Sequence, residues 1–190
     1  GILTGFLLCA NQYAHVIDFI DTFKQEDTLL LVDPVMADDG EIYATYTPEM
    51  VEGVKKLCTK ADIITPNLTE LRILSGEEDI FSGGEKMLQK GIKSVIVTGV
   101  VEGEEISNYV FHNGTAKKYK TEFIKNAKEG GSFSGTGDIF SSFVLGKILN
   151  GFSVFEAVEQ AVEFIGKAIK SSDIKNRNDG IDFEPFLKNI

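Results

Sequence analysis

At residues 28–34 the chain reads Thr28-Leu29-Leu30-Leu31-Val32-Asp33-Pro34, a nearly unbroken apolar run that ends in a carboxylate and a proline. A run without polar alternation is typical of a strand covered on both faces, as the strands of parallel sheets are. Two shorter runs of the same kind follow, at residues 61–65 before Pro66 and at residues 93–98 before Gly99. The sequence therefore predicts a buried, mostly parallel sheet.

Helical periodicity separates and follows these runs. Apolar residues recur at helical spacing, and this pattern predicts helices over residues 11–23, 48–60, 67–75, 82–91, 136–149 and 153–171. Thr47-Pro48 offers an N-cap followed by proline at the first helical position, and Ser82-Gly83-Gly84-Glu85 matches a capping box. Asn113-Gly114 predicts a β-hairpin, which would add to one edge of the sheet. We expect one α/β domain over residues 1–190.

Composition and charge argue against several classes of protein. The 190 residues carry a formal net charge of −10, which disfavours a nucleic-acid-binding surface. No apolar run approaches the roughly 20 residues that a membrane-spanning helix needs. The two cysteines match neither a disulfide nor a zinc pattern and fit buried thiols in a reducing cytoplasm. Residues 1–8 resemble the end of a buried strand, so we expect that an N-terminal portion is missing.

Polar side chains follow each predicted strand. In open α/β sheets, ligands gather at the carboxyl ends of the strands. Those ends carry Asp33, Thr65 with Asn67, and Thr98, and Glu70 follows one turn later. Asp33, Asn67 and Glu70 could hold a hard cation through oxygen ligands, and Thr98 could offer its hydroxyl to a phosphate or a ribose. Each residue also has a structural alternative, because turns and helix caps use the same residue types.

A glycine-rich loop precedes the helix predicted at residues 136–149. It reads Gly131-Ser132-Phe133-Ser134-Gly135-Thr136-Gly137-Asp138. Glycines near a helix start let backbone amides approach a ligand, and the helix N-terminus favours an anion. A carboxylate there repels an anion, but it has a use if Asp138 takes a proton from a nucleophile that attacks a bound phosphate. A first-turn Asp that only stabilises the helix is the alternative. Neither a Walker-type loop nor a Gly-x-Gly-x-x-Gly motif is present, and Phe133 breaks a match to Gly-x-Ser-x-Gly.

Three motifs occur in order along the chain: Asp33-Pro34-Val35-Met36, Thr65-Pro66-Asn67 with Glu70, and Gly135-Thr136-Gly137-Asp138. Together they resemble the pyridoxal kinase family, the vitamin B6 branch of the ribokinase-like superfamily. The resemblance implies a single three-layer α/β/α domain with a mostly parallel central sheet and an antiparallel edge hairpin. It also implies ATP-dependent phosphorylation of the 5′-hydroxymethyl group of pyridoxal, pyridoxine or pyridoxamine by a cytoplasmic homodimer.

The resemblance also implies roles for individual residues. Asp138 would be the base that deprotonates the hydroxyl, and the amides of Gly135, Thr136 and Gly137 would form an anion hole. The residues implied to bind Mg-ATP are Asn67, Glu70, Thr98, Asp38 and Thr136. Those implied at the metal are Asp33, Thr65 and Glu70, and those implied to face the substrate are Phe6, Gly135 and Asp138. Mg²⁺ is the implied cofactor and ATP the co-substrate, and a monovalent cation is a further candidate.

The chain departs from the family pattern in ways that leave alternatives open. Gly5-Phe6 stands where the family usually has Gly-Tyr, and Glu129 brings a negative charge close to the anion hole. The first βαβ region, which supplies much of the vitamin pocket in the family, is absent. Hydroxymethylpyrimidine kinase of thiamine synthesis is a close rival, although that branch typically carries Cys at the position of Asp138. A non-catalytic nucleotide-binding relic is the alternative outside the enzymes.

Overall fold

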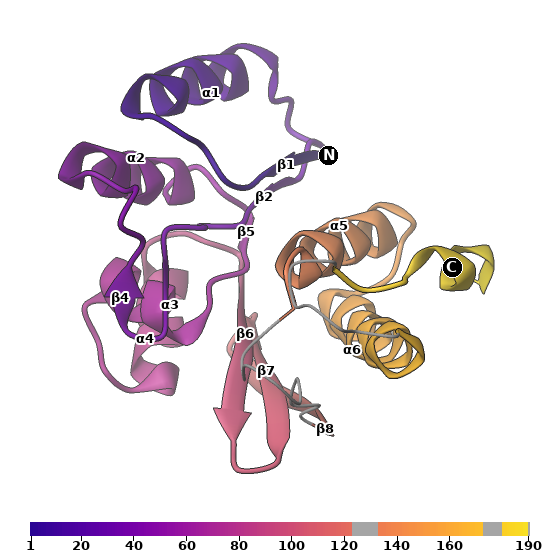
Figure 1. Ribbon diagram of the computed structural model, residues 1–190. Coiled ribbons are helices and arrows are strands. Elements are labelled where there is room, and N and C mark those ends of the chain that lie inside the picture. The colour runs from indigo at the N-terminus through magenta and orange to yellow at the C-terminus, as the bar shows by residue number, and fades with distance from the viewer. Residues whose placement is uncertain (123–132, 173–179, 190) are drawn as a thin grey trace.

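A computed structural model describes residues 1–122, 133–172 and 180–189. Its centre is a six-stranded sheet in the order β1-β2-β5-β6-β7-β8 (Figure 1). The strands are β1 (Ile2–Thr4), β2 (Leu30–Val32), β5 (Ile63–Ile64), β6 (Ser94–Glu102), β7 (Glu105–His112) and β8 (Thr115–Glu122). Strands β1, β2, β5 and β6 pair in parallel, whereas β7 and β8 add to β6 as antiparallel strands. The predicted mostly parallel sheet with an antiparallel edge hairpin is confirmed.

Helices cover both faces of this sheet, which confirms the three-layer α/β/α architecture (Figure 1). On one face lie α1 (Ala10–Phe23), α2 (Pro48–Cys58), α3 (Leu68–Ser75) and α4 (Ile80–Gln89). On the other lie α5 (Thr136–Leu149) and α6 (Val154–Ser171), followed by a 3-10 helix over Glu184–Asn189. Thr47 caps α2 through its side chain and Pro48 is the first helical residue, as predicted.

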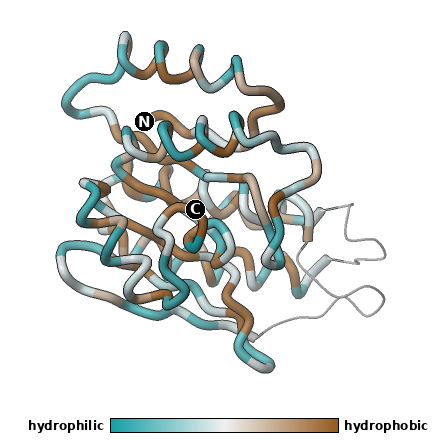
Figure 2. Tube along the Cα trace, turned by 90° about the vertical axis from the view of Figure 1, so that its left-hand side faces the viewer, coloured by the Kyte–Doolittle hydropathy of each residue, from teal (hydrophilic) through white to brown (hydrophobic). Residues whose placement is uncertain are grey.

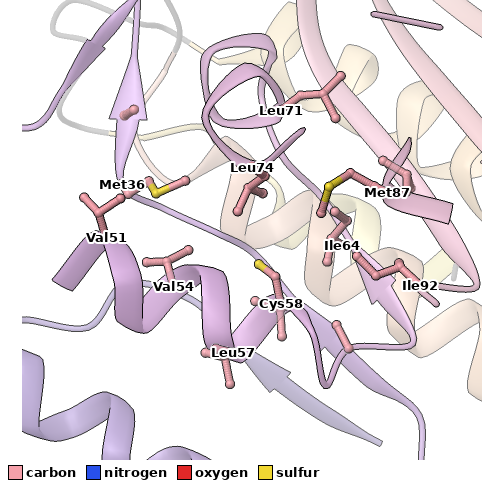
Figure 3. Packing of buried hydrophobic residues seen from close by; sticks show 14 of the residues in the cluster. Met36, Val51, Val54, Leu57, Cys58, Ile64, Leu71, Leu74, Met87 and Ile92 are labelled. Carbon is pink, nitrogen blue, oxygen red and sulfur yellow. The ribbon is translucent and has the colours of Figure 1, made fainter. Parts of the chain in front are cut away.

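The core lies in two layers, one on each side of the sheet. Side chains alternate along a strand, so Leu30 and Val32 pack toward α1–α4 while Leu31 packs toward α5 and α6. Burial on both sides explains why this strand is apolar throughout. Figure 3 shows the first layer, in which Cys58 and Met87 lie near Ile64. Figure 2 shows hydrophobic residues along the inner segments and hydrophilic residues along the outer turns.

One predicted helix start is wrong, and the apolar face of one helix is only partly buried. Helix α4 begins at Ile80 instead of Ser82, because the Asp79 carboxylate accepts a hydrogen bond from the Ser82 amide (2.9 Å) and so caps the helix earlier. On α1, Phe19 and Phe23 do not join the core. They are 50% and 59% exposed and contact each other on the surface, with ring centroids 4.8 Å apart.

The cysteines follow the sequence-based expectation in part, and aromatic residues hold the C-terminal segment. Cys58 is buried, but Cys9 is exposed just before α1, so the prediction of two buried thiols is wrong for Cys9. Phe183 and Phe186 pack onto the α5–α6 layer, whereas Leu187 is largely exposed. The end of the chain is therefore held to the body by its aromatic residues.

One strand boundary and one additional sheet also differ from the prediction. Strand β6 continues past Thr98 to Glu102, through an irregularity between Val97 and Val100. Gly99 has φ +69° there, a conformation that glycine adopts without strain. A second, two-stranded sheet was not predicted. It pairs β3 (Ala37–Asp38) with β4 (Glu41–Ile42) across a turn at Asp39-Gly40.

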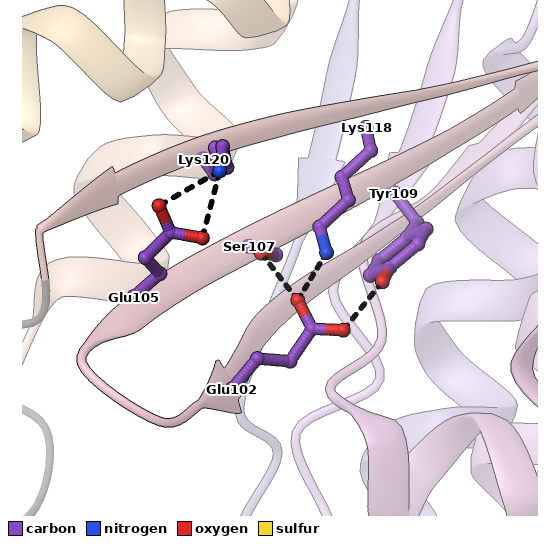
Figure 4. Close-up of polar contacts among 6 residues, drawn as sticks. All are labelled: Glu102, Glu105, Ser107, Tyr109, Lys118 and Lys120. Carbon is purple, nitrogen blue, oxygen red and sulfur yellow. Dashed lines mark hydrogen bonds and ion pairs between the residues drawn. The ribbon is translucent and has the colours of Figure 1, made fainter.

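The strands β6–β8 extend beyond the other strands of the sheet (Figure 1) and carry a polar cluster (Figure 4). The Glu102 carboxylate accepts hydrogen bonds from the Ser107 hydroxyl (2.8 Å) and the Tyr109 hydroxyl (2.8 Å), and it forms an ion pair with Lys118. Glu105 on β7 forms an ion pair with Lys120 on the neighbouring strand β8 (2.8 Å). Such exposed pairs each contribute little free energy, but together they join all three strands in register.

Candidate active site

The carboxyl ends of the parallel strands meet at one edge of the sheet, and backbone hydrogen bonds extend past the strands to fix the residues there. The Asp33 amide donates to a carbonyl of β1 (2.9 Å), and the Thr65 amide donates to a carbonyl of β2 (3.2 Å). The Thr98 amide donates to the carbonyl just before Asn67 (2.9 Å), and Asn67 and Thr98 form an isolated parallel bridge. The four polar residues predicted at the strand ends therefore do come together.

The start of α5 lies against the same edge. A Cβ atom built on Gly5, just after β1, would be 3.6 Å from Asp138 Oδ1, and one built on Gly137 would be 3.7 Å from Asp33 Oδ2. The carboxylate of Asp138 therefore lies beside the end of β1, and the backbone of the glycine-rich loop lies beside the end of β2. Asp138 itself is exposed, so its carboxylate is accessible to a ligand.

The first turn of α5 presents backbone amides to this edge. The N-cap residue is Gly135, with φ +78°, and within the described residues no side chain caps the helix. The Thr136 hydroxyl (2.7 Å) and the Thr136 amide (3.3 Å) both donate to the Phe133 carbonyl, so Thr136 supports the turn and its amide already has a partner. The first amides of a helix have no intrahelical partner and carry a partial positive charge. This helix start can therefore hold an anion next to Asp138.

Asp33 is a buried carboxyl group with two hydroxyl neighbours. It is 9% exposed, and Ser141 Oγ lies 3.5 Å from its Oδ2 and 3.0 Å from Thr65 Oγ1. Burial raises the pKa of Asp33 to about 7, and the charge of Asp138 adds to the rise, while hydrogen bonds from Thr65 and Ser141 oppose it. A group held in this way attracts a cation, because a positive charge would offset the desolvation of the carboxylate.

Glu70 and Asn67 form a reciprocal capping box at the start of α3. The Glu70 carboxylate accepts hydrogen bonds from the amides of Asn67 (2.9 Å), Met36 (3.0 Å) and Ala37 (3.4 Å), and the Glu70 amide donates to Asn67 Oδ1 (2.9 Å). Asn67 Nδ2 donates to the Ala37 carbonyl (2.7 Å). Burial raises the pKa of Glu70 to about 8, although these amide donors act in the opposite direction. Both side chains thus fix the segment that leads into β3.

The donor set at this edge fits a cation that arrives with phosphate. Among the described residues, no group of three His, Cys, Asp or Glu side chains is placed to hold a metal ion by itself. Asp33 and the Thr65 hydroxyl supply hard oxygen ligands, whereas both oxygens of Glu70 already accept amide hydrogens. Mg²⁺ commonly binds through one or two carboxylates, phosphate oxygens and water. The residues therefore fit Mg²⁺ carried by a nucleotide, with Asp33 the best-placed carboxylate.

No lysine or arginine neutralises these acids within the part of the chain that is described. The nine ion pairs of that part involve none of Asp33, Glu70 or Asp138. The positive end of α5 is therefore the clearest protein group that favours an anion here. A nucleotide that brings its own cation would suit this combination of charges.

Sequence reasoning missed an aromatic cluster beside the acids. The Tyr46 hydroxyl donates to the Val35 carbonyl, and its ring lies 6.0 Å from that of Phe6 and 6.3 Å from that of Tyr43. The Tyr43 amide donates to the Met36 carbonyl (3.0 Å). Partial burial raises the pKa of Tyr43 to about 12, and the charges of Asp38, Glu70 and Asp33 add to the rise. The tyrosines that closely follow the Asp-Gly turn were the available signal. Phe6 is 50% exposed and available to a ligand.

An apolar groove begins at Asp138 and runs along α5. It has a volume of about 790 Å³ and is lined on the helix by Ser142, Phe143 and Gly146, and on the far side by Phe183. The groove places a large hydrophobic surface directly beside the exposed carboxylate of Asp138. Residues 129–132, which precede the predicted anion hole, lie outside the described residues.

The described helices include none that is both long and apolar enough to cross a bilayer.

Three comparisons place the chain among known proteins. Residues 2–181 match the family described as phosphomethylpyrimidine kinase. A hydroxymethylpyrimidine/phosphomethylpyrimidine kinase of Aquifex aeolicus is 31% identical over 179 residues, which cover 90% of this chain and 68% of that protein. The first curated relatives are longer, and the chain spans between 52% and 68% of their length.

Two solved structures have the same fold. One is a candidate phosphomethylpyrimidine kinase of Bacteroides thetaiotaomicron in a crystal form with pyridoxal, 33% identical with a TM-score of 0.88 over 99% of this chain and 69% of that one. The other is the pyridoxal kinase of Staphylococcus aureus in complex with AMP-PCP and pyridoxal. It is 25% identical with a TM-score of 0.80 over 99% of this chain and 68% of that one.

Proposed function

Since the chain belongs to the pyridoxal kinase and phosphomethylpyrimidine kinase family of the ribokinase-like superfamily, we propose that the protein is an ATP-dependent kinase acting on vitamin B6. Its reaction would be phosphorylation of the 5′-hydroxymethyl group of pyridoxal, pyridoxine or pyridoxamine. One observation carries the proposal. The exposed Asp138 carboxylate lies at the positive end of α5, beside Gly5 and close to the buried Asp33.

The proposed chemistry follows from this arrangement. Asp138 accepts the proton of the substrate hydroxyl as that oxygen attacks the γ-phosphorus of ATP, and ADP leaves with the electrons of the broken P–O bond. Amides of Gly135 and Gly137 hold the phosphoryl oxygens during the transfer, and the Thr136 amide joins them by exchanging its bond to the Phe133 carbonyl (3.3 Å) for one to phosphate. Phosphoryl transfer depends mainly on positioning and charge stabilisation, which a helix start provides. A placed base typically adds about 10²–10⁴-fold to the rate.

The nucleotide would lie across the ends of β5 and β6. Asn67, Thr98 and Asp38 are the proposed contacts on that side, and Glu70 supports them through its hydrogen bonds to the backbone. Mg²⁺ bound with ATP would neutralise phosphate charge, and Asp33 with the Thr65 hydroxyl would hold the cation. A monovalent cation is a further candidate for the same oxygen ligands.

The B6 ring would lie near Phe6, which offers an exposed aromatic face beside Tyr46. We infer that polypeptide outside residues 1–190 completes this side of the pocket. Two features support the inference: β1 has a strand partner on one side only among the described residues, and the apolar groove opens beside Asp138. The greater length of the relatives agrees with it.

Hydroxymethylpyrimidine kinase is the second candidate. The match to the phosphomethylpyrimidine kinase family and the Aquifex aeolicus relative favour it. Asp138 favours a vitamin B6 kinase over a hydroxymethylpyrimidine kinase, because the pyrimidine branch typically carries Cys at this position. A non-catalytic nucleotide-binding protein is the third candidate and would not depend on Asp138.

The deciding experiment measures ADP release by the complete protein with ATP and Mg²⁺, using pyridoxal, pyridoxine and hydroxymethylpyrimidine as acceptors. We expect a higher kcat/KM for a B6 vitamer than for the pyrimidine. A higher value for the pyrimidine would assign the second function. Nucleotide binding without turnover of any acceptor would support the third.

A further inference from the structure

A buried hydroxyl joins the catalytic helix to the sheet. Ser141 lies in the second turn of α5 and is 1% exposed, and its Oγ is 3.0 Å from Thr65 Oγ1 at the end of β5. The same Oγ is 3.5 Å from Asp33 Oδ2 at the end of β2. One side chain thus contacts polar groups at the ends of two neighbouring strands.

Packing alone does not explain a serine here. The neighbouring contacts of α5 with this face of the sheet are apolar and include Phe140, Val144 and Leu145. A buried hydroxyl is costly unless it is hydrogen-bonded, and alanine would fill nearly the same volume without that requirement. Each of the two hydroxyls has one proton, so one can donate to Asp33 while the other donates to its partner hydroxyl. Because hydrogen bonds depend on direction, they fix the orientation of Ser141 relative to the two strand ends, which an apolar contact would not do.

The contacts of Ser141 also hold the first turn of α5 in place. Ser141 follows Asp138 by three residues, which is close to one helical turn. Gly137, immediately before Asp138, also lies against the Asp33 carboxylate, since a Cβ there would be 3.7 Å from Oδ2. The helix start is thereby held at two points by the ends of β2 and β5. A rotation or shift of α5 would move Asp138 and break the contacts of Ser141 together.

On the basis of the proposed function, we propose that Ser141 is a positioning residue for phosphoryl transfer. Through Thr65 and Asp33 it fixes the start of α5, and so sets where the Asp138 carboxylate meets the substrate hydroxyl. Ser141 itself touches neither substrate nor nucleotide. Because small errors in placing a reacting group can cost about 10²-fold in rate, loss of the hydroxyl should lower kcat more than it affects binding.

The test compares serine variants in the complete protein. Ser141→Ala and Ser141→Cys remove a strong hydroxyl donor, Ser141→Thr keeps one, and Ser75→Ala is the matched control, because it removes a buried hydroxyl from α3. We expect Ser141→Ala and Ser141→Cys to lower kcat by about tenfold, with KM for pyridoxal unchanged within about twofold. Ser141→Thr should retain most of kcat, and Ser75→Ala should keep the wild-type kcat. Melting temperatures measured without ligand verify that each variant is folded. If Ser141→Ala is unstable, the near-isosteric Ser141→Cys variant replaces it in the kinetic comparison.

Two results would overturn the proposal. Wild-type kcat in a folded Ser141→Ala or Ser141→Cys variant would show that the hydroxyl does not position the helix. Equal losses in the Ala, Cys and Thr variants would show that packing matters and the hydrogen bonds do not. Asp138→Asn in the same assay separates this outcome from failure of the proposed function. If Asp138→Asn abolishes turnover while Ser141→Ala does not, only the role of Ser141 is wrong.

Discussion

Replacing Asp33 with Asn should stabilise the protein at alkaline pH while impairing its activity. The Asp33 carboxyl is 9% exposed, and its pKa rises from an ordinary value of 3.8 to about 7, chiefly through burial. A pKa that is higher in the folded state means that the folded protein binds a proton more tightly than the unfolded chain does. The contribution of Asp33 to the free energy of unfolding is therefore fully present below about pH 4, and it is lost as the pH rises through about 7.

The size of the effect follows from these values. Each tenfold change in proton affinity corresponds to about 1.4 kcal/mol. Relative to low pH, the raised pKa of Asp33 therefore lowers the free energy of unfolding by about 4 kcal/mol at pH 8 and by about 1.5 kcal/mol at pH 5, where only the unfolded chain has lost the proton. Asn removes this cost but weakens the hydrogen bonds with Ser141 and Thr65, at about 1 kcal/mol each. The variant should therefore match the wild type near pH 5 and exceed it by about 2 kcal/mol at pH 8.

Urea unfolding followed by circular dichroism at both pH values measures this difference, with Asp18→Asn on the exposed face of α1 as a control. Burial also raises the pKa of Glu70, to about 8, and the charge of Asp33 contributes to that rise, so loss of this charge in Asp33→Asn adds to the gain in stability at pH 8. A difference between Asp33→Asn and wild type that stays constant from pH 5 to pH 8 would refute the reasoning. So would a variant that is less stable at both values.

Three further substitutions test other parts of the structure. Asp62→Asn should lower the free energy of unfolding by about 2 kcal/mol without changing kcat, because the buried Asp62 carboxylate pairs with Lys24 and Lys93 at 2.7 Å each; an unchanged urea midpoint would contradict this. Gly84→Ala should cost about 1–3 kcal/mol, since its Cβ would lie 2.6 Å from the Phe111 ring, whereas Gly166→Ala, with an ordinary 3.6 Å contact, should be tolerated. Asn67→Ala should remove the α3 cap and the bond to the Ala37 carbonyl, lowering stability by about 1–2 kcal/mol and raising KM for ATP; an unchanged KM would argue against a nucleotide contact.

The sequence was sufficient for the sheet and for most of the helices. A strand buried on both faces must be apolar throughout, so residues 30–32 could be recognised without other information. Helix starts were predictable where the capping group is local, as at Thr47. The start of α4 was not, because Asp79 and Ser82 both had capping chemistry and only the backbone path decides between them.

Features that depend on tertiary contacts could not be predicted. The extension of β6 past Thr98 requires β7 as a partner, and nothing in residues 99–102 alone distinguishes it from a loop. The exposure of Phe19 and Phe23 depends on how α1 lies over α2, which periodicity does not specify.

The candidate site was predicted as a set of residues but not as a set of contacts. Asp33, Thr65 and Asp138 were recognisable from their places at strand ends and at a helix start. Ser141 and Tyr43 were missed, because a serine in a helix and a tyrosine after a turn have many ordinary explanations. Only the fold shows that Ser141 contacts Asp33 and Thr65, and that the Tyr43 backbone is bonded to Met36.

The most direct test of the proposed mechanism is the turnover of Asp138→Asn in the complete protein, with pyridoxal, ATP and Mg²⁺ at saturating concentrations. Asn keeps the size of the side chain and removes its capacity to accept a proton. We predict that kcat falls by about 10²–10⁴-fold while the affinity for ATP stays within a few-fold of wild type. A kcat within tenfold of the wild-type value would contradict the role of Asp138 as the base.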